Sequence, residues 1–266
     1  MKNGFLFKLR ILLKSIEIFR NWYLYPLVYF NLTNKPFVIF ETKNGLKMKI
    51  RTKSTDLMAL TNVWLIQEYF QKKNGIKNDG TILDIGAHIG LFCLYASQYN
   101  KSGKIFCFEP IKENHKLLLE NIELNSIKNI IPFNLAVSSE SEKIKMYLSN
   151  DQAGHSIFLK NSKPVKVDSI SLKKIFDDNK IDKSSFVKLD CEGAEYDIIK
   201  SAPIEYLMKI DKIVMECHFV NSKSQYVKKT VEKLDDSKFE VKLVYTNNDL
   251  GLIFASRKTN QNFIHS

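Results

Sequence analysis

Two apolar segments, each ending in an acidic residue with glycine close behind it, constrain the fold of this chain more than any other feature. They are Ile82-Leu83-Asp84-Ile85-Gly86 and, much later, Val187-Lys188-Leu189-Asp190-Cys191-Glu192-Gly193. Each is typical of a buried parallel strand that gives way to a loop, and ligands of parallel α/β sheets bind at such strand ends. The sequence therefore predicts an enzyme with a nucleotide cofactor.

The composition predicts one large α/β domain. The chain has 266 residues, of which 44% are hydrophobic, enough for a substantial core. Its formal charge of +11 suits nucleic acid, an anionic membrane surface or acidic glycans, and charge alone does not choose among them. No stretch has the roughly 18 uninterrupted apolar residues of a membrane-spanning helix, and charged residues interrupt the N-terminus where a signal peptide would be apolar. We therefore predict a cytoplasmic protein.

The patterning divides the chain into a basic amphipathic helical segment (1–35), a hairpin with a helix (36–75) and a catalytic domain (76–258). In the first part, six apolar residues recur at steps of four and three, which places them on one helix face: Phe5, Leu9, Leu12, Ile16, Phe19 and Tyr23. Such a face most commonly docks onto its own domain or onto a second subunit. The alternative is that residues 5–30 lie at the inner face of an anionic membrane. The oligomeric state stays open.

The rest of the chain is expected to alternate strands and helices. A hairpin over 37–42 and 46–51, turning at Asn44-Gly45, precedes a helix over 55–70. Buried strands are expected at 81–85, 104–108, 130–137, 186–189 and 212–217, with helices at 91–99 and 110–125. An insertion near the substrate side has short strands at 143–148 and 165–172 around a polar loop at 150–155, and strands 240–246 and 250–255 form a terminal antiparallel pair around a turn at 247–249. The fold class is therefore α/β, a doubly wound and mostly parallel sheet.

The first strand-to-helix turn predicts the class of cofactor. Gly86 and Gly90 allow a sharp turn and a close approach to a ligand. The turn lacks the Gly-x-Gly-x-x-Gly pattern of dinucleotide sites, and the chain has no Gly-Lys-Ser/Thr phosphate loop. Instead, Asp84 ends the first strand and Glu109 the second, where an acid can accept hydrogen bonds from both hydroxyls of a ribose. A cofactor with an adenosine, an amino-acid end and a positive sulfur fits this pattern better than one with two phosphates.

These segments resemble the FkbM-type family of S-adenosylmethionine-dependent methyltransferases. The resemblance covers roughly residues 46–220 and rests on motifs in the family's order, with further family-like residues at Arg51, Asp56, Glu216 and His218. The motifs are Asp84-Ile85-Gly86-Ala87-His88-Ile89-Gly90, Phe108-Glu109-Pro110, Asn134-Leu135-Ala136-Val137-Ser138 and Lys188-Leu189-Asp190-Cys191-Glu192-Gly193-Ala194-Glu195. The family usually has asparagine where this chain has His88, and aspartate where it has Lys173.

The resemblance implies a class I methyltransferase fold. It also implies that S-adenosylmethionine is bound by the residues of these motifs, with the last of them near the adenine: Asp84, Gly86, His88, Gly90, Glu109 and Ala136.

Methyl transfer from a sulfonium is an in-line displacement, so the enzyme must position the acceptor oxygen and can remove its proton. Asp190 and Glu192 follow the fourth strand, beside the expected methyl position, and are candidates for the base or for a hydroxyl anchor. His218, at the end of the next strand, is a second candidate. Together with Glu216 these residues could form an oxygen-rich metal site, but we expect them to hold substrate hydroxyls directly. A divalent metal is thus compatible with the site but not expected.

The resemblance implies an O-methyltransferase acting on a hydroxyl of a sugar, a glycan or another polyhydroxylated metabolite, and the basic N-terminus suits a glycolipid acceptor. The net charge makes a nucleic-acid methyltransferase one alternative. However, base methylation commonly uses an Asn/Asp-Pro-Pro-aromatic loop after the fourth strand, where this chain has acids that would repel phosphate. We therefore expect no specific nucleic acid. The other alternative is an inactive methyltransferase-fold scaffold recruited through the N-terminal helix.

Overall fold

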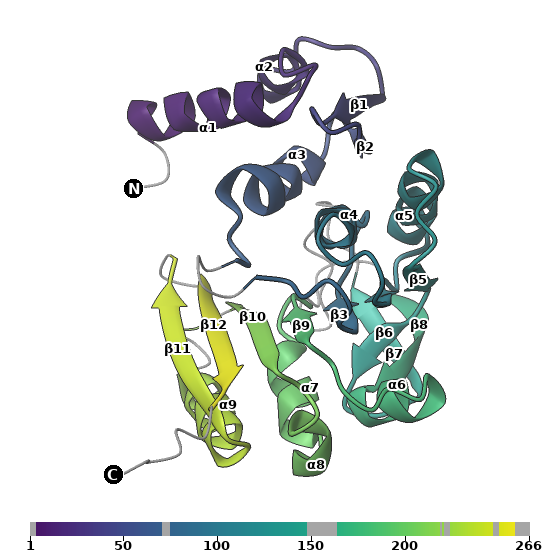
Figure 1. Cartoon of the computed structure of the whole chain (residues 1–266), viewed down its shortest axis with the longest axis vertical. Helices are drawn as coiled ribbons and strands as arrows, with labels where there is room; N and C mark the ends of the chain where they lie inside the picture. Colours follow the sequence, from purple (N-terminus) through teal and green to yellow (C-terminus); the bar gives the residue numbers. More distant parts are fainter. Residues whose placement is uncertain are drawn as a thin grey trace, which may run out of the picture.

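A seven-stranded sheet forms the centre of the computed structural model, which describes residues 4–70, 75–147, 164–218, 220, 224–246 and 250–258 (Figure 1). The strand order is β11-β12-β10-β9-β3-β4-β5. Neighbours from β10 to β5 are parallel, whereas β12 runs antiparallel to both β10 and β11. The strands are β3 (Ile82–Ile85), β4 (Ile105–Phe108), β5 (Ile130–Phe133), β9 (Phe186–Leu189), β10 (Lys212–His218), β11 (Phe239–Tyr245) and β12 (Leu250–Arg257). The expected sheet is confirmed.

Helices cover both faces of this sheet, because the side chains of its strands alternate between two hydrophobic cores. On β3, Ile82 belongs to one core and Leu83 and Ile85 belong to the other. The first core includes α4 (Leu91–Ser97), α5 (Lys112–Leu124) and the N-terminal elements. The second includes α6 (Leu172–Asp178), α7 (Glu195–Ser201), α8 (Ile204–Leu207) and α9 (Ser224–Asp236).

The predicted hairpin is confirmed as a separate two-stranded sheet of β1 (Phe37–Glu41) and β2 (Lys47–Arg51). Its turn places Gly45 at φ 91, a backbone angle that glycine adopts without a steric penalty. The amide of Asn121 on α5 bonds to both backbone groups of Lys49, with its Oδ1 2.7 Å from the nitrogen, and its Nδ2 also donates to the carbonyl of Ile89. One side chain therefore joins the hairpin to the turn that follows β3.

The helix expected over residues 55–70 is shorter than predicted. It begins as α3 (Asp56–Leu60), widens into a π-helical turn, η1 (Thr61–Ile66), and ends at Gln67, whose φ of 57 is left-handed. Because a left-handed residue cannot continue a right-handed helix, the chain leaves the helix axis here. The buried side chain of Tyr69 follows this turn and points into the core instead of along a helix face.

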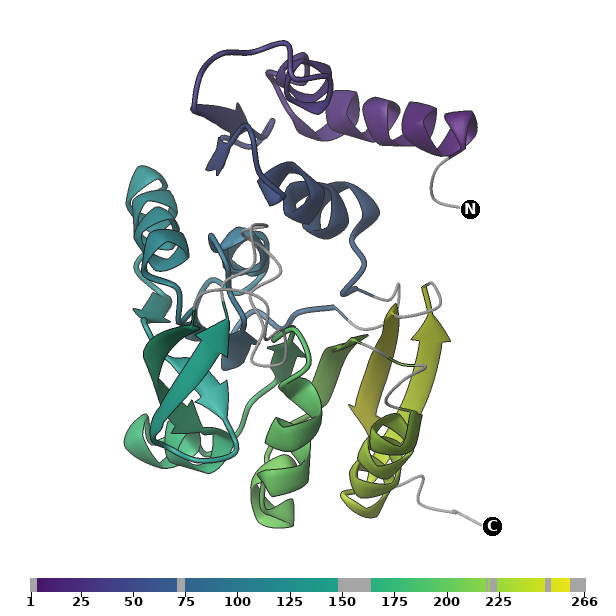
Figure 2. The same ribbon diagram turned by 180° about the vertical axis from the view of Figure 1, so that it is seen from behind.

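The first two helices, α1 (Phe5–Ile18) and α2 (Leu24–Tyr29), lie at one end of the molecule beyond α3 (Figure 1, Figure 2). The helix is confirmed, but most of the predicted apolar face does not dock. Of its six residues Phe19 is buried, whereas Phe5 is 79% exposed and Leu9, Ile16 and Tyr23 are exposed as well. Ile11 and Ser15, which lie outside that face, are buried. The α1 helix thus has apolar residues on two sides, and only one side packs against the domain. Within the described ranges no helix is both long and apolar enough to cross a membrane.

The single strand predicted over 130–137 is wrong, because the chain changes sheets after β5. Asn134 donates its side-chain amide to the carbonyls of Glu109 and Pro110, which breaks the strand. Beyond it, β6 (Ala136–Ser138), β7 (Lys143–Tyr147) and β8 (Pro164–Ser171) form a three-stranded sheet of order β6-β8-β7. Strand β8 ends at Ser171, which caps α6 by accepting a hydrogen bond from the backbone nitrogen of Lys174. The predicted loop at 150–155 and turn at 247–249 lie outside the described residues.

Candidate active site

A pocket lies at the carboxyl ends of β3, β4 and β9, where the sequence predicts a ligand. Six of the predicted site residues line it: Gly86, His88, Glu109, Ala136, Asp190 and Glu192. The insertion also reaches the pocket, as expected, through Ile144 and Met146 of β7. Asp84, Gly90 and His218 are not among the described residues that line it. The cofactor contact expected of Asp84 and Gly90 stays a prediction.

The turn after β3 packs directly against the end of β9, which explains its glycine. Gly86 has a φ of 77, and a β-carbon on it would overlap the carbonyl oxygen of Asp190. Gly90, with a φ of 85, begins α4 and faces the side chain of Leu118. Between them His88 has a φ of 51, a left-handed angle that asparagine and histidine adopt more readily than most residues. The local sequence thus brings the ends of two neighbouring strands together.

Two backbone amides orient Glu109 at the end of β4. Its Oε2 accepts a hydrogen bond from the nitrogen of His88 at 2.8 Å, and its Oε1 accepts one from the nitrogen of Ile111 at 2.9 Å. The side chain of Asn114 also hydrogen-bonds this carboxylate. Burial raises the pKa of Glu109 to about 7, in spite of these donors. The geometry is that of a fixed carboxylate at the pocket, with acceptor capacity left for a ligand hydroxyl.

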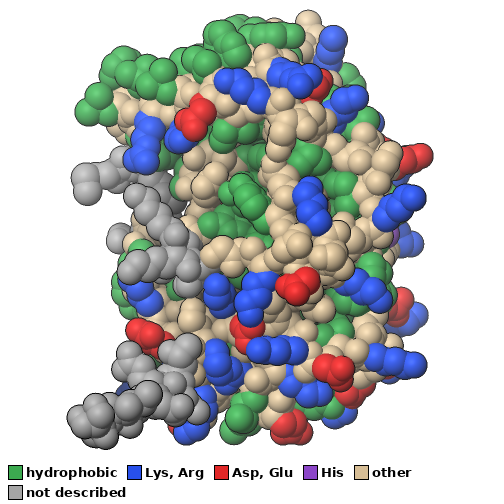
Figure 3. Space-filling view, viewed as in Figure 1, with side chains coloured by type: hydrophobic (Ala, Val, Ile, Leu, Met, Phe, Trp, Pro, Cys, Tyr) green, Lys and Arg blue, Asp and Glu red, His purple; other side chains and the backbone are tan. Residues whose placement is uncertain are grey.

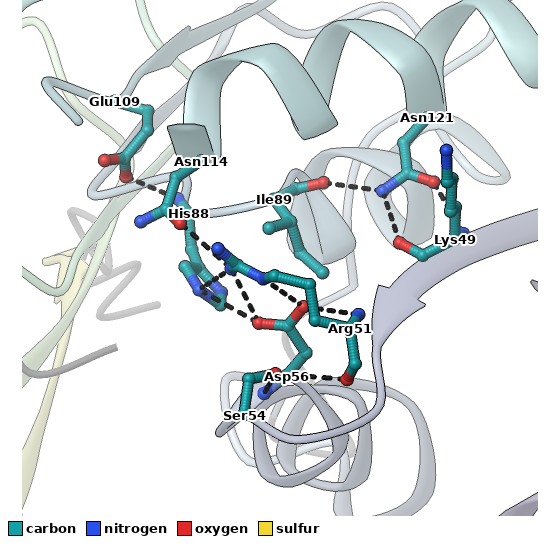
Figure 4. Close-up of polar contacts among 9 residues, drawn as sticks. All are labelled: Lys49, Arg51, Ser54, Asp56, His88, Ile89, Glu109, Asn114 and Asn121. Carbon is teal, nitrogen blue, oxygen red and sulfur yellow. Dashed lines mark hydrogen bonds and ion pairs between the residues drawn. The ribbon is translucent and has the colours of Figure 1, made fainter. Parts of the chain in front are cut away.

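The hairpin contributes a buried polar network to the same turn (Figure 4). Arg51 donates from Nε and Nη2 to the two carboxylate oxygens of Asp56, each at 2.8 Å, and from Nη2 to Asn114 at 2.9 Å. Arg51 Nη2 also lies 3.2 Å from His88 Nε2. Burial lowers the pKa of His88 to about 4, so the ring is neutral, and its Nε2 also lies 3.4 Å from Asp56 Oδ1. The network fixes the His88 side chain at the pocket wall.

A buried lysine to which the sequence motifs assign no role lines the pocket. Lys188 Nζ donates to the carbonyl of Gly86 at 2.8 Å and lies 3.2 Å from Asp84 Oδ1 and 3.6 Å from Asp190 Oδ2. Burial opposes its charge, but Asp84 and Asp190 raise the pKa of Lys188. The sequence does mark this residue as unusual, because Lys188 interrupts an apolar strand that is buried on both faces. Asp84 therefore balances the charge of this lysine.

Tyr69 connects two acids that come from neighbouring strands. Its hydroxyl lies 3.0 Å from Asp190 Oδ2 and 3.1 Å from Glu216 Oε2. A phenol has one proton, so one of the acids must donate in return. Burial and the nearby Asp190 raise the pKa of Glu216 well above its usual value. Burial opposes the charge of Asp190 as well, but Lys188 and His218 lower its pKa, so Glu216 holds the proton and Asp190 is ionised.

His218 lies between Glu195 and Glu192. Its Nδ1 is 2.9 Å from Glu195 Oε1, and its Nε2 is 3.4 Å from Glu192 Oε2. Burial alone would lower its pKa, but these carboxylates raise the pKa of His218 to about 10. The imidazole is therefore protonated at neutral pH, and the role of His218 as a base or hydroxyl anchor stays a prediction.

Two of these acids and His218 are close enough to bind one metal ion. In the described part of the chain, Asp190, Glu192 and His218 each offer a ligand atom, and these atoms lie within 4.8 Å of one another. Carboxylate oxygens with one imidazole suit a divalent cation, on the condition that the imidazole loses its proton. The expectation that no metal is needed stays a prediction.

The order and direction of the strands in the central sheet define a class I methyltransferase fold. The family model described as "Methyltransferase FkbM domain" matches residues 84–241, more than half of the chain. The chain belongs to the FkbM methyltransferase family, and its cofactor is S-adenosylmethionine.

Among characterised relatives, the hexuronic acid methyltransferase AglP of Haloferax volcanii is 22% identical over 213 residues, covering 76% of this chain and 84% of that protein. The methyltransferase sdnD of Sordaria araneosa is 25% identical over 169 residues, covering 51% of this chain and 65% of that protein. Among solved structures, M. jannaschii TYW2 in complex with AdoMet is 13% identical at a TM-score of 0.48, covering 84% of this chain and 86% of that one. The family membership follows from the match over residues 84–241.

Proposed function

We propose that this chain transfers the methyl group of S-adenosylmethionine to a hydroxyl oxygen of a sugar, a glycan or a glycolipid headgroup. The observation that supports this most is the carboxylate of Asp190 at the pocket wall, held by Tyr69 at 3.0 Å. The relative AglP, described as a hexuronic acid methyltransferase, supports a sugar acceptor.

The pocket fits the proposed division between cofactor and acceptor. S-adenosylmethionine supplies an electrophilic methyl group on a positive sulfur. Glu109 offers two fixed acceptor oxygens for the ribose hydroxyls, and apolar residues that include Phe108, Ile111 and Ala136 line the same pocket and suit an adenine ring. Asp190 and Glu192 place negative charge at the pocket on the side of β9, where it would stabilise a cationic cofactor.

Asp190 is the group suited to act on the acceptor. It is ionised and lies at the pocket, so it can accept a hydrogen bond from an acceptor hydroxyl and take its proton as the oxygen forms the new bond. Tyr69 and Lys188, which line the same pocket, hold the carboxylate in place. Glu192 is a second hydroxyl anchor, and the protonated His218 limits its movement through their 3.4 Å ion pair.

Calorimetric titration with S-adenosylmethionine, S-adenosylhomocysteine and NAD tests the cofactor site, with Glu109→Ala as the variant expected to lose binding. Transfer of a labelled methyl group to free hexoses, hexuronic acids and glycolipids then tests the acceptor class. Asp190→Asn should lose transfer but keep the binding of S-adenosylhomocysteine, which has no positive sulfur. Transfer to RNA in place of sugars would contradict the proposal, and cofactor binding with no transfer to any acceptor would favour a scaffold.

A further inference from the structure

The end of the molecule formed by α1 and α2 exposes an unusual amount of apolar surface. In the described part of the chain nineteen large hydrophobic side chains are exposed, and ten of them fall between residues 5 and 32. We call these ten the apolar platform: Phe5, Leu6, Leu9, Leu13, Ile16, Trp22, Tyr23, Tyr29, Phe30 and Leu32. Proteins rarely leave so many large apolar side chains together in water unless the surface binds something.

The basic residues of this segment flank the platform. At about 100° per residue, Lys8 falls on one side of the exposed face of α1, and Arg10 and Lys14 fall on the other. Glu17 is the one acidic residue among the first 35, against six lysines and arginines. Figure 3 shows hydrophobic side chains gathered along this end of the molecule, with Lys and Arg side chains beside them.

We propose that the apolar platform inserts into the headgroup region of an anionic lipid bilayer and anchors the enzyme in the plane of the membrane. An amphipathic helix that lies in this plane combines exposed apolar residues with flanking lysine and arginine and with interfacial aromatics. The platform has all three, since Trp22, Tyr23 and Tyr29 are the aromatics. The basic flanks favour anionic lipid headgroups over the apolar surface of a neutral protein partner.

The anchor would also place the pocket close to the membrane. The α1 and α2 helices pack on η1 and α3, and these two elements line the pocket with Met58, Asn62 and Val63. One short segment therefore separates the platform from the site. The proposal does not depend on the acceptor, because vesicle binding is measured without methyl transfer.

The test is co-sedimentation of the full chain with vesicles of phosphatidylcholine alone or mixed with phosphatidylglycerol. We expect binding to the mixed vesicles. The variant Leu6→Ser/Leu9→Ser/Leu13→Ser should reduce it about a hundredfold or more, because three large apolar side chains no longer leave water. The matched control Leu119→Ser/Ile204→Ser/Met208→Ser removes three side chains of similar exposure elsewhere and should bind as the wild type does.

Charge is tested separately. Lys8→Ala/Arg10→Ala should weaken binding to mixed vesicles about thirtyfold, from about 1 kcal/mol for each basic residue, with little change on neutral vesicles. Failure of the folded wild type to bind mixed vesicles would overturn the proposal, as would equal losses in the two triple-serine variants. Light scattering tests whether a second copy of the chain covers the platform instead. If the wild type is a dimer that binds no vesicles, and the platform variant is a monomer, this face is a subunit interface.

Discussion

The ammonium of Lys188 lies 3.2 Å from Asp84 Oδ1, and these two almost fully buried residues are direct neighbours on adjacent strands. Lys188→Met would leave the carboxylate of Asp84 without its cation and should lower the free energy of unfolding by about 3–5 kcal/mol in urea denaturation. The double variant Asp84→Asn/Lys188→Met should lose clearly less than the sum of the single variants.

The matched control for this pair is Lys173→Met, which removes an exposed ion pair with Asp177 and should change stability far less. Equal effects of Lys188→Met and Lys173→Met would contradict a structural role for the buried pair.

Cofactor binding should depend on pH through Glu109. Burial raises its pKa to about 7, so the carboxylate is ionised above this pH and protonated below it. A protonated acid loses part of its capacity to accept from ribose hydroxyls. The affinity for S-adenosylhomocysteine should therefore fall about fivefold as the pH is lowered from about 7 to about 6.

Glu109→Gln keeps the shape of the side chain without its titration. In calorimetry it should bind about tenfold more weakly at high pH and show a flat profile over the same range. A profile in the variant as steep as that of the wild type would assign the pH dependence to another group.

Removal of the Tyr69 hydroxyl should affect catalysis more than binding. Tyr69→Phe takes away the donor that holds Asp190, so kcat for sugar methylation should fall about tenfold while the affinity for S-adenosylmethionine stays the same. Tyr206→Phe is the matched control, because the Tyr206 hydroxyl donates to Asp177, which does not line the pocket. A similar loss in both variants, or a loss of cofactor affinity in Tyr69→Phe, would contradict this role.

Chelation tests whether Asp190, Glu192 and His218 bind substrate hydroxyls directly or hold a metal ion. If Asp190 and Glu192 bind hydroxyls directly, as we expect, methyl transfer should continue after treatment with EDTA. The protonated His218 already supplies positive charge beside Glu192 at 3.4 Å. Loss of transfer on chelation, with recovery on addition of Mg²⁺, would instead make Asp190, Glu192 and His218 a metal site.

The sequence by itself determined the strands and the acids at their ends. The apolar runs that become β3, β4, β9 and β10 are short, local patterns, and their carboxyl ends meet at one edge because the sheet is parallel. Local patterns alone are therefore sufficient to place Glu109 and Asp190 at a common pocket. The sharp turn at Gly86 is also predictable from the local sequence. The carbonyl of Asp190, for which this glycine makes room, is not predictable in this way.

Only the tertiary structure decided which groups contact these acids. Tyr69 is 121 residues from Asp190 and 147 from Glu216, and no local pattern relates side chains so far apart. The pairing of Asp84 with Lys188 depends on strand register, which the alternation of apolar residues leaves free when both faces of a strand are buried. The same limit applies to α1, because a helix with apolar residues on two sides gains similar free energy by burying either one, and the shape of the surface on which it packs selects the side.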